Sequence, residues 1–438
     1  MLNYALVRPA VQRSDLAALT PYLLTLMLRN MSSDGFAFSD PADPGQFSAP
    51  GCIIASPSFA GDQAAVTQDY VYNWTRDAAV TATELAYAGL PAGDAGGTGP
   101  LDDYVSFAST CQQNAPGLDT ASYTIEGRPR PGWSLQNDGP ALQALTIFQA
   151  FGQLSPATQD TARTMAERDL QFVVDRYQTP NTNLWEEVAG QSFFTRAVQL
   201  RCLIQAQGNA LGITVPAGAD GAIAWLRDAL ASHWNGQYYI SVLDAQNPRW
   251  GYDPNIDIVM ASVYGAVDCA DPQLLATAAL LREQWADPGS PVKYPINVAD
   301  TAQGLGPLLG RYPGDSYDGD QNAPAQGHPW ALTTANFAEL YYRLAARIQQ
   351  TGQVPASPLA ADYLGQAGIG AGTAAGDAAR LLRAAGDQML QAIVYHSDHL
   401  ELSEQFDAST GYEKSVRNLT WSYAAFLSAA RARAAVAA

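Results

Sequence analysis

"NLWEEVAGQSFFTRAVQLR", residues 183–201, places an aromatic and acidic loop directly before a stretch with the period of an apolar helix. The same order recurs at other places along the chain, which predicts a repeated architecture of polar loops and helices. The recurring stretches are "YVYNWTRD" (70–77), "GWSLQNDGP" (132–140), "RWGYDPN" (249–255), "RYPGDSYDG" with "GHPW" (311–330) and "LSEQFDASTGYEKSVRN" (402–418).

The Ala-rich segments between these loops show the 3.6-residue period of helices, and the alternation typical of strands is scarce. We expect twelve helices, near 14–31, 77–90, 102–113, 139–153, 158–177, 191–207, 219–235, 255–268, 273–286, 329–350, 374–398 and 418–434, with a further turn near 299–310. The polar stretches precede every second helix. If successive helices run in opposite directions, all six polar loops lie at one end, where six inner helices point their N-termini at one cavity. We therefore predict an all-α (α/α)6 barrel, with six outer helices around the inner ring.

The chain is expected to form one domain over residues 1–438. Its only low-complexity stretch, 364–379, is short and should be a loop entering the eleventh helix. No Ser-, Thr- or Pro-rich linker separates a second module. Loops 32–76 and 287–328 are much longer than the usual connection of about 4–6 residues, so we expect them to contribute to function.

Composition excludes several classes of partner. The net charge is −18, with only 15% charged residues and no basic run. This argues against binding to nucleic acid or to an anionic membrane, whereas a neutral polar substrate would meet no repulsion. No stretch approaches the ~20 apolar residues of a membrane span.

The four cysteines, Cys52, Cys111, Cys202 and Cys269, are scattered and lack the spacing of a metal site or of a CxxC motif. We expect buried thiols, and the cysteines do not decide between an oxidising and a reducing compartment. The first residues lack the charged and then apolar pattern of a secretory leader. The compartment is therefore also left open, because a leader could have been removed.

Glu186 and Glu187 are framed by Trp185 and other apolar residues. An aromatic wall and a neighbouring carboxylate each raise the pKa of a carboxylic acid, which can then donate a proton near neutrality. The alternative is a solvated pair at a helix N-terminus, and the local stretch on its own favours that alternative.

Glu404, between Leu402 and Phe406, lies in another loop of the same predicted pole. Alone it would be assigned to the surface. Together with Glu186 it meets the requirement of glycoside hydrolysis for one acid and one base. Inversion would need about 6.5–9.5 Å between the two carboxyl groups, and retention about 5–5.5 Å.

The stretch 70–77 brings aromatic residues to Arg76 and Asp77. A sugar could pack its apolar faces on the rings and hydrogen bond to the charged groups. The alternative is that Asp77 caps a helix and that the aromatic residues only pack. The stretch Gln136, Asn137 and Asp138, before a Gly-Pro helix start, leaves the same two alternatives open.

Other catalytic templates are absent: the chain has no dinucleotide-binding glycine motif, no phosphate-binding loop and no HExxH motif. Its four histidines show no convincing metal spacing. We expect neither a metal nor a cofactor.

With these residues identified, the chain resembles the glucoamylases of glycoside hydrolase family 15. The resemblance rests on "IIASPS" (53–58), "YVYNWTRD", "QNDGPAL", "LWEEVAGQSFFT", "GRYPGDSY", "GHPW" and "SEQFDASTG…NLTWSYAAFL", in this order. It implies an inverting exo-hydrolase on an (α/α)6 barrel that releases β-glucose from the non-reducing ends of α-1,4-glucans or maltooligosaccharides. It also implies no cofactor, and we expect a monomer.

The resemblance implies a role for each matching residue. Glu186 would be the general acid and Glu404 the general base. The remaining residues would bind substrate: Arg76, Asp77 and Arg311 the hydroxyls of the terminal glucose, Tyr70 the region of the base and water, Trp74 and Trp185 the pocket wall, Glu187 the next sugar, with Trp133, Leu184, Tyr317 and Trp330 completing the set.

Three departures from the family pattern qualify these assignments. Asn183 stands where the family usually has Asp, so tuning of the acid could differ. The loop before "QNDGP" shifts Trp133 by one position and lacks the usual arginine, which affects the second subsite and with it the preference for linkage and chain length. No starch-binding module is found, so soluble dextrins are expected rather than granules.

Three alternatives remain. A glucodextranase-like hydrolase of α-1,6 linkages would use the same scaffold. An inverting sugar phosphorylase would need no second carboxylate, and Glu404 argues against it. A non-catalytic sugar-binding protein would have lost one of the two carboxylates, whereas both are present.

Overall fold

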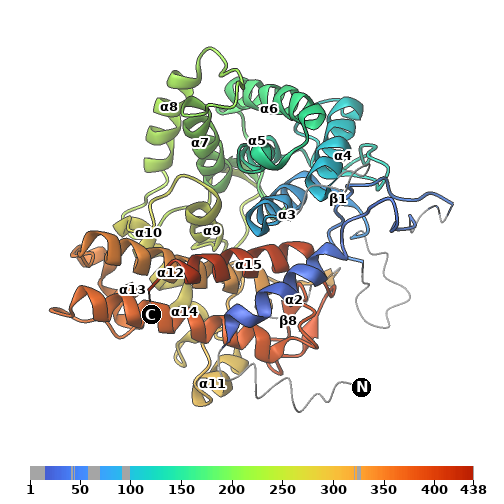
Figure 1. The fold of residues 1–438 in the computed structure, drawn as a ribbon. Coiled ribbons are helices and arrows are strands. Elements are labelled where there is room, and N and C mark those ends of the chain that lie inside the picture. The colour runs from blue at the N-terminus through green and yellow to red at the C-terminus, as the bar shows by residue number, and fades with distance from the viewer. Residues whose placement is uncertain are drawn as a thin grey trace.

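The computed structural model describes residues 15–40, 43, 45–57, 70–90, 99–319, 321–322 and 327–437. Helices dominate these residues (Figure 1). Six of them form an inner ring, in which each helix contacts the next and the last returns to the first. In ring order they are α3 (Thr75–Ala88), α5 (Gly139–Ala150), α7 (Phe193–Gln207), α9 (Asp257–Tyr264), α12 (Ala331–Thr351) and α15 (Thr420–Ala434).

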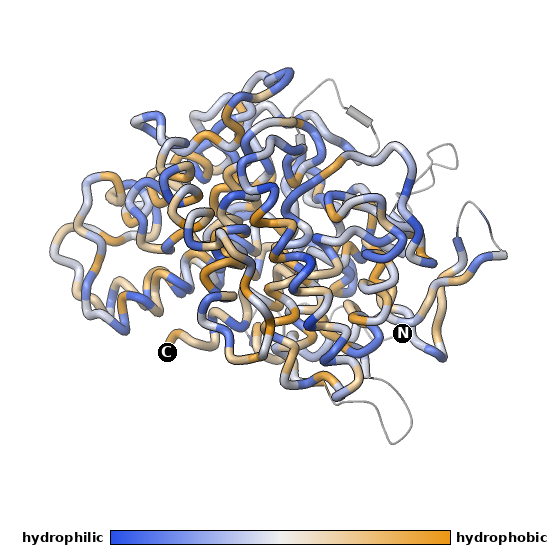
Figure 2. Tube along the Cα trace, turned by 90° about the horizontal axis from the view of Figure 1, so that it is seen from above, coloured by the Kyte–Doolittle hydropathy of each residue, from blue (hydrophilic) through white to orange (hydrophobic). Residues whose placement is uncertain are grey.

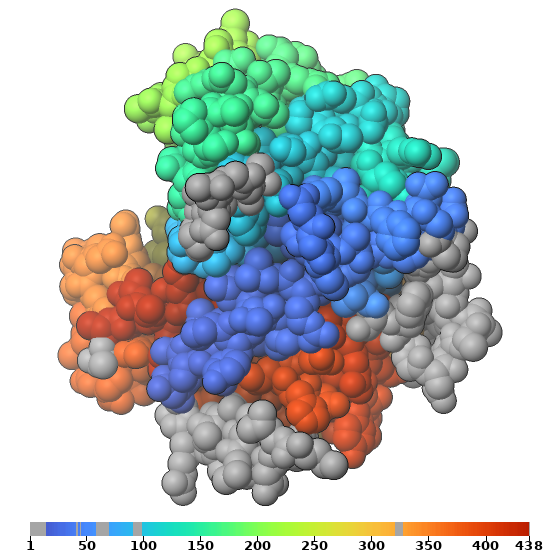
Figure 3. All heavy atoms as spheres, turned by 45° about the vertical axis from the view of Figure 1, so that its right-hand side comes forward, coloured from blue at the N-terminus to red at the C-terminus, as the bar shows by residue number. Residues whose placement is uncertain are grey.

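Outer helices alternate with the inner ones along the chain and pack against them. They are α2 (Leu16–Leu28), α4 (Pro100–Asn114), α6 (Pro156–Arg176), α8 (Ala219–Ala231), α10 (Pro272–Ala286) and α14 (Ala375–His396). Helix α2 lies against α15, so the two ends of the described chain meet, as the blue and red segments of Figures 1 and 3 show. This arrangement is the predicted (α/α)6 barrel.

The two rings differ in burial as their sequences predict. Inner helices such as α5 and α15 are buried on nearly all sides, because neighbours surround them. The outer helix α14 is amphipathic: Ala378 and Leu382 are buried, whereas Arg380 is exposed. Most buried apolar residues form one continuous core, and Figure 2 shows hydrophobic segments running through the centre of the molecule.

Short antiparallel strands support the loops at the N-terminal ends of the inner helices. Strand β1 (Asn73–Trp74) pairs with β2 (Ser122–Tyr123), β6 (Tyr317–Asp318) with β7 (Gln321–Asn322), and β8 (Gln405–Phe406) with β9 (Glu413–Lys414). A three-stranded sheet joins β3 (Asn181–Thr182), β4 (Ala189–Ser192) and β5 (Val242–Gln246).

All twelve predicted helices are found, but some of their bounds differ. Helix α9 ends at Tyr264, four residues before its predicted end, because the chain then passes very close to α7: a Cβ atom on Gly265 would lie 2.7 Å from the Cβ of Ala197. Residues 1–14, which include the first position predicted for α2, lie outside the described residues.

The turn predicted near 299–310 is misplaced, because helix α11 (Pro295–Ala302) begins at a proline suited to a first turn. A further short helix, α13 (Ala361–Gln366), was not predicted and takes up the start of the supposed loop 364–379. Two 3-10 turns complete the described helical elements, at Phe151–Gln153 and Pro358–Ala360.

All four cysteines carry free thiols, and three of them are buried, as expected. Cys269, at the surface of the core, is only partly buried. Among the described residues, no helix is both long enough and apolar enough to span a membrane.

Candidate active site

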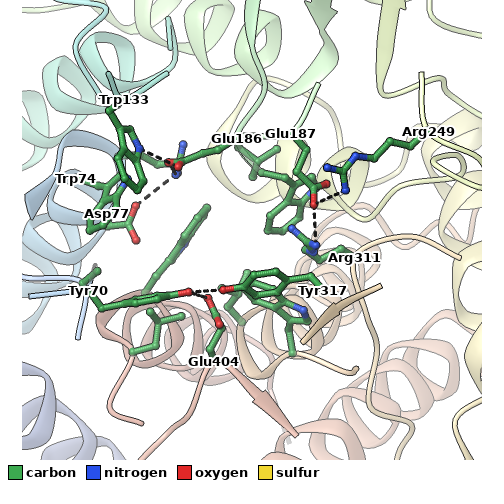
Figure 4. A pocket seen from close by; sticks show the side chains of 18 residues that line it. Tyr70, Trp74, Asp77, Trp133, Glu186, Glu187, Arg249, Arg311, Tyr317 and Glu404 are labelled. Carbon is green, nitrogen blue, oxygen red and sulfur yellow. Dashed lines mark hydrogen bonds and ion pairs between the residues drawn. The ribbon is translucent and has the colours of Figure 1, made fainter. Parts of the chain in front are cut away.

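A pocket of about 380 Å³ lies at the end of the barrel where the inner helices begin. Residues from all six polar loops line it, which confirms that these loops lie at one pole (Figure 4). Every site residue predicted from the sequence lines it: Tyr70, Trp74, Arg76, Asp77, Trp133, Leu184, Trp185, Glu186, Glu187, Arg311, Tyr317, Trp330 and Glu404.

The acidic pair lies in a tight turn rather than at a helix N-terminus. Glu186 has a left-handed φ of 63°, which is uncommon for a residue with a side chain, and its N–H donates to the carbonyl oxygen of Asn183 at 2.9 Å. The buried side-chain oxygen of Asn183 accepts from the N–H groups of Glu187 and Val188, each at 3.2 Å. Helix α7 begins only at Phe193, so the helix-capping alternative for the pair is wrong.

The Glu186 carboxylate has two partners. Its Oε2 accepts from the indole N–H of Trp133 at 2.8 Å, and its Oε1 lies 3.5 Å from Nη2 of Arg76. The side chain remains 22% exposed toward the pocket. The indole that hydrogen bonds to it is therefore that of Trp133, whereas the expected neighbour, Trp185, donates its N–H to Asn255 at 3.0 Å.

Glu187 is directed to the opposite wall, away from Trp133 (Figure 4). Its Oε1 lies 3.0 Å from both Arg311 and Arg249, and its Oε2 accepts from the hydroxyl of Tyr312 at 2.7 Å. Burial alone would lower the pKa of Arg311, but the carboxylates of Asp315 and Glu187 outweigh burial and raise it well above the usual value. The adjacent glutamates thus serve two separate networks.

Arg76 and Asp77 close the other side of the pocket. Arg76 donates to Gln136 at 2.5 Å and to Asp138 at 3.2 Å, which fixes its guanidinium group. Burial raises the pKa of Asp77 to about 6, although the charge of Arg76 opposes this shift. Among the described residues, Nε of Arg76 and Oδ2 of Asp77 have no hydrogen-bond partner, although they form an ion pair at 3.5 Å.

These contacts decide between the alternatives left by the sequence. Helix α3 starts at Thr75, so Asp77 lies in its first turn and does not cap it. Gln136 and Asp138 do not line the pocket but hold Arg76, and the carbonyl of Asn137 accepts from Gln199 at 3.3 Å. The amide cluster therefore positions a pocket residue.

Glu404 is 4% exposed and lies across the pocket from Glu186 (Figure 4). Its Oε1 accepts from the Tyr70 hydroxyl at 2.8 Å, and its Oε2 accepts from the hydroxyl of Ser415. The Tyr70 hydroxyl also shares a 2.6 Å hydrogen bond with that of Tyr317. Burial and the adjacent Glu404 raise the pKa of Tyr70 well above its usual value, so the phenol keeps its proton.

Sequence reasoning missed several residues of this site. Arg249 and Trp421 line the pocket, and the guanidinium carbon of Arg76 lies 5.2 Å from the centre of a Trp421 ring. Arg249 belongs to the polar stretch 249–255, whereas Trp421, in the first turn of α15 (Thr420–Ala434), belongs to "NLTWSYAAFL", one of the stretches that carry the family resemblance. Ser415 lies in the polar stretch 402–418, but its contact with Glu404 depends on the β8–β9 hairpin and could not be predicted from that stretch. No group of three potential metal ligands occurs in the described part of the chain.

Comparison with known proteins agrees with this geometry. The family model described as "Glycosyl hydrolases family 15" matches residues 24–431. "Glucoamylase 1" of Rhizopus oryzae is 29% identical, over 93% of this chain and 69% of the relative. A family 15 glucoamylase structure from Hypocrea jecorina superposes with a TM-score of 0.79 at 25% identity, over 96% of this chain and 72% of that chain. The glucoamylase structure from Saccharomycopsis fibuligera gives a TM-score of 0.75 at 24% identity, over 97% and 96%. With a match over nearly its whole length, the chain belongs to glycosyl hydrolases family 15 and is a glycoside hydrolase.

Proposed function

We propose that this enzyme releases β-D-glucose from the non-reducing ends of α-1,4-glucans and maltooligosaccharides with inversion at the anomeric carbon. The observation that carries the proposal is the pair of carboxylates, Glu186 and Glu404, on opposite sides of one pocket. An inverting glycosidase needs a proton donor on one face of the sugar and a base with its water on the other. Relatives named glucoamylase support the choice of substrate.

Glu186 is the proposed general acid. Its carboxyl group is the more exposed of the two, and its neighbour in the turn, Glu187, faces with Arg311 the side on which a second sugar would leave. From this position it would protonate the glycosidic oxygen as the bond to the anomeric carbon breaks. The Trp133 N–H and Arg76 would orient the carboxylate that remains and stabilise its charge.

Glu404 is the proposed general base. Hydrogen bonds from Tyr70 and Ser415 hold its two carboxylate oxygens in the wall of the pocket. A water bound there would lose a proton to Glu404 as its oxygen attacks the anomeric carbon from the face opposite the departing sugar. The step conserves protons, because Glu186 donates one to the departing sugar and Glu404 accepts one from the water.

Exo-action would follow from the wall made by Arg76 and Asp77. Both side chains line the pocket, where the guanidinium group of Arg76 would donate hydrogen bonds to, and the carboxylate of Asp77 would accept them from, the hydroxyls of a terminal glucose. The rings of Trp74 and Trp133 pack edge to face beside them, with 5.4 Å between the ring centres.

We propose in addition that residues 1–438 act as one catalytic domain and as a monomer.

Glu404→Gln tests the assignment of the base. We expect kcat on maltotriose to fall by at least 10³-fold while maltotriose still binds, because the amide cannot accept the proton. Near-normal turnover would contradict the role of Glu404.

Initial rates of the wild type on maltotriose and isomaltotriose decide which linkage the enzyme prefers. Faster cleavage of isomaltotriose would replace the α-1,4 proposal by an α-1,6 one.

A further inference from the structure

A second cavity lies toward the end of the barrel opposite the active-site pocket. It has a volume of about 130 Å³, and all six inner helices line it, mostly with residues from their C-terminal halves. Its polar lining includes Glu84 of α3, Arg201 and Gln205 of α7, Arg343 of α12 and Arg431 of α15. Among the described residues, none lines both cavities, so this cavity is separate from the active site.

The cavity is positively charged within a strongly acidic protein. Three arginines and one glutamate line it, whereas the net charge of the chain is −18. Glu84 lies 2.7 Å from Arg431, and the fully buried Glu339 lies 2.6 Å from Arg343. Arg201 forms no ion pair within the described part of the chain, and its only hydrogen bonds there go to backbone carbonyl groups. One positive charge of the cavity is therefore left without a partner.

Arg201 also has N–H groups that are available to a ligand. Its Nη1 donates to the carbonyl oxygens of Val263 at 3.1 Å and of Tyr264 at 3.0 Å, at the C-terminal end of α9. Stabilising the end of that helix explains these two hydrogen bonds. It leaves Nε and Nη2 without a hydrogen-bond partner among the described residues. Burial, and after it the charge of Arg343, lower the pKa of Arg201, so an anion beside this guanidinium would be stabilised.

The other two arginines are held in fixed positions. Nη2 of Arg431 donates to the hydroxyl of Ser428 at 3.1 Å, and its guanidinium carbon lies 3.7 Å from the centre of the Tyr87 ring. Nη2 of Arg343 donates to the carbonyl oxygen of Val263 at 3.0 Å. The side chains of Arg431 and Arg343 are still 37% and 31% exposed, so a ligand can reach them. Groups that are already fixed lose little freedom when a ligand binds.

We propose that this cavity is a binding site for a small oxyanion, the phosphate or carboxylate group of a ligand. Arg201 donates hydrogen bonds from Nε and Nη2 to two oxygens of the anion, the paired geometry that a guanidinium group offers to both of these groups. Arg343 and Arg431 add positive charge beside it. A neutral glucan has no group that matches this charge, so the cavity takes a different ligand from the active-site pocket. The site does not depend on the proposed function.

Calorimetric titration of inorganic phosphate into the whole chain at constant ionic strength tests the proposal, with two variants of the cavity. Arg201→Gln removes the main donor. Gln205→Glu keeps the size of a side chain one helical turn from Arg201, and its carboxylate would occupy the free N–H groups and repel an anion. Each change should weaken phosphate binding at least about 10-fold, because charge-assisted hydrogen bonds are lost.

Arg380→Gln is the matched control. It makes the chain more negative by one charge, as do both cavity variants, but Arg380 lies on the outer helix α14 and its side chain is 65% exposed. Phosphate affinity should stay within about 2-fold in this control, because exposed charges interact weakly. Acetate, titrated in the same way, distinguishes the two kinds of ligand: tighter binding of phosphate points to a phosphate group, and tighter binding of acetate to a carboxylate.

The proposal is overturned if neither anion binds to the wild type, or if both cavity variants bind as tightly as the wild type. The second result would also follow if phosphate bound only to the arginines of the active-site pocket, which neither variant changes. If Arg201→Gln fails to fold because α9 loses its hydrogen bonds, Gln205→Glu alone decides. Binding is read without turnover, so the outcome is independent of whether the enzyme cleaves maltotriose.

Discussion

Ser415 gives the sharpest prediction about the proposed base. Its hydroxyl hydrogen bonds to Oε2 of Glu404, while Tyr70 donates to Oε1. It lies outside the pocket lining, so Ser415→Ala removes one restraint on the base without removing a contact to the sugar. The variant therefore tests the position of Glu404 separately from substrate binding.

The size of the effect follows from the kind of hydrogen bond lost. A hydrogen bond to a charged group contributes about 1.5–3 kcal/mol, and each ~1.4 kcal/mol corresponds to about tenfold in rate. Because the Tyr70 bond remains, we expect the lower part of that range, a fall in kcat of about 10- to 30-fold. KM for maltotriose should stay within about 2-fold, because Glu404 keeps its place in the pocket wall.

The assay is steady-state hydrolysis of maltotriose, with Ser409→Ala as the control. Ser409 lies in the same hairpin but is exposed, and its hydroxyl does not contact Glu404. In a Glu404→Gln background, Ser415→Ala should have little further effect, because the two changes act on one group. A kcat above half of the wild-type value, or an equal loss in the Ser409 control, would refute the reasoning.

Three further predictions concern the residues around the acid and the core. Asn183→Asp should keep kcat within about 3-fold, because a carboxylate can accept hydrogen bonds from the same two N–H groups and from the hydroxyl of Tyr252. Asn183→Ala should lower kcat at least 100-fold, because the turn that holds Glu186 loses these hydrogen bonds. Equal rates in the two variants would contradict this prediction. Glu187→Gln should raise KM about tenfold with a smaller change in kcat, since it weakens the link between Arg249 and Arg311, and an unchanged KM would argue against a binding role. Burial raises the pKa of Asp257 to about 8, so the contribution of its protonated form to stability is complete below about pH 4 and is lost as pH rises through 8. Relative to Asp257→Asn, the wild type should therefore lose up to about 1.4 kcal/mol of unfolding free energy per pH unit between pH 5 and 8. Urea titrations that show a pH-independent difference between the two proteins would contradict this.

Much of the fold could be predicted from local sequence. The alternation of polar loops with Ala-rich helices identified the ring order, because each loop had to serve an inner helix whose N-terminus faces the cavity. Helix ends were less accurate, as at Gly265, where the helix stops because of contact with another helix. A contact between two helices far apart in the sequence does not change the local periodicity of hydrophobic residues.

The site was predicted as a set of residues, but their pairings could not be. The sequence put Glu186 beside Trp185, yet the left-handed turn brings it to Trp133 instead. The link from Ser415 to Glu404 depends in the same way on hairpin geometry. The sequence thus predicted which residues line the pocket, and tertiary structure decided which of them contact one another.

The central claim is that Glu186 and Glu404 act on opposite faces of the same glucosyl unit. Proton NMR of the first glucose released from maltotriose tests it most directly, recorded before mutarotation mixes the anomers. The account predicts the β-anomer, because water activated by Glu404 attacks from the face opposite the leaving group. Initial release of α-glucose would contradict it.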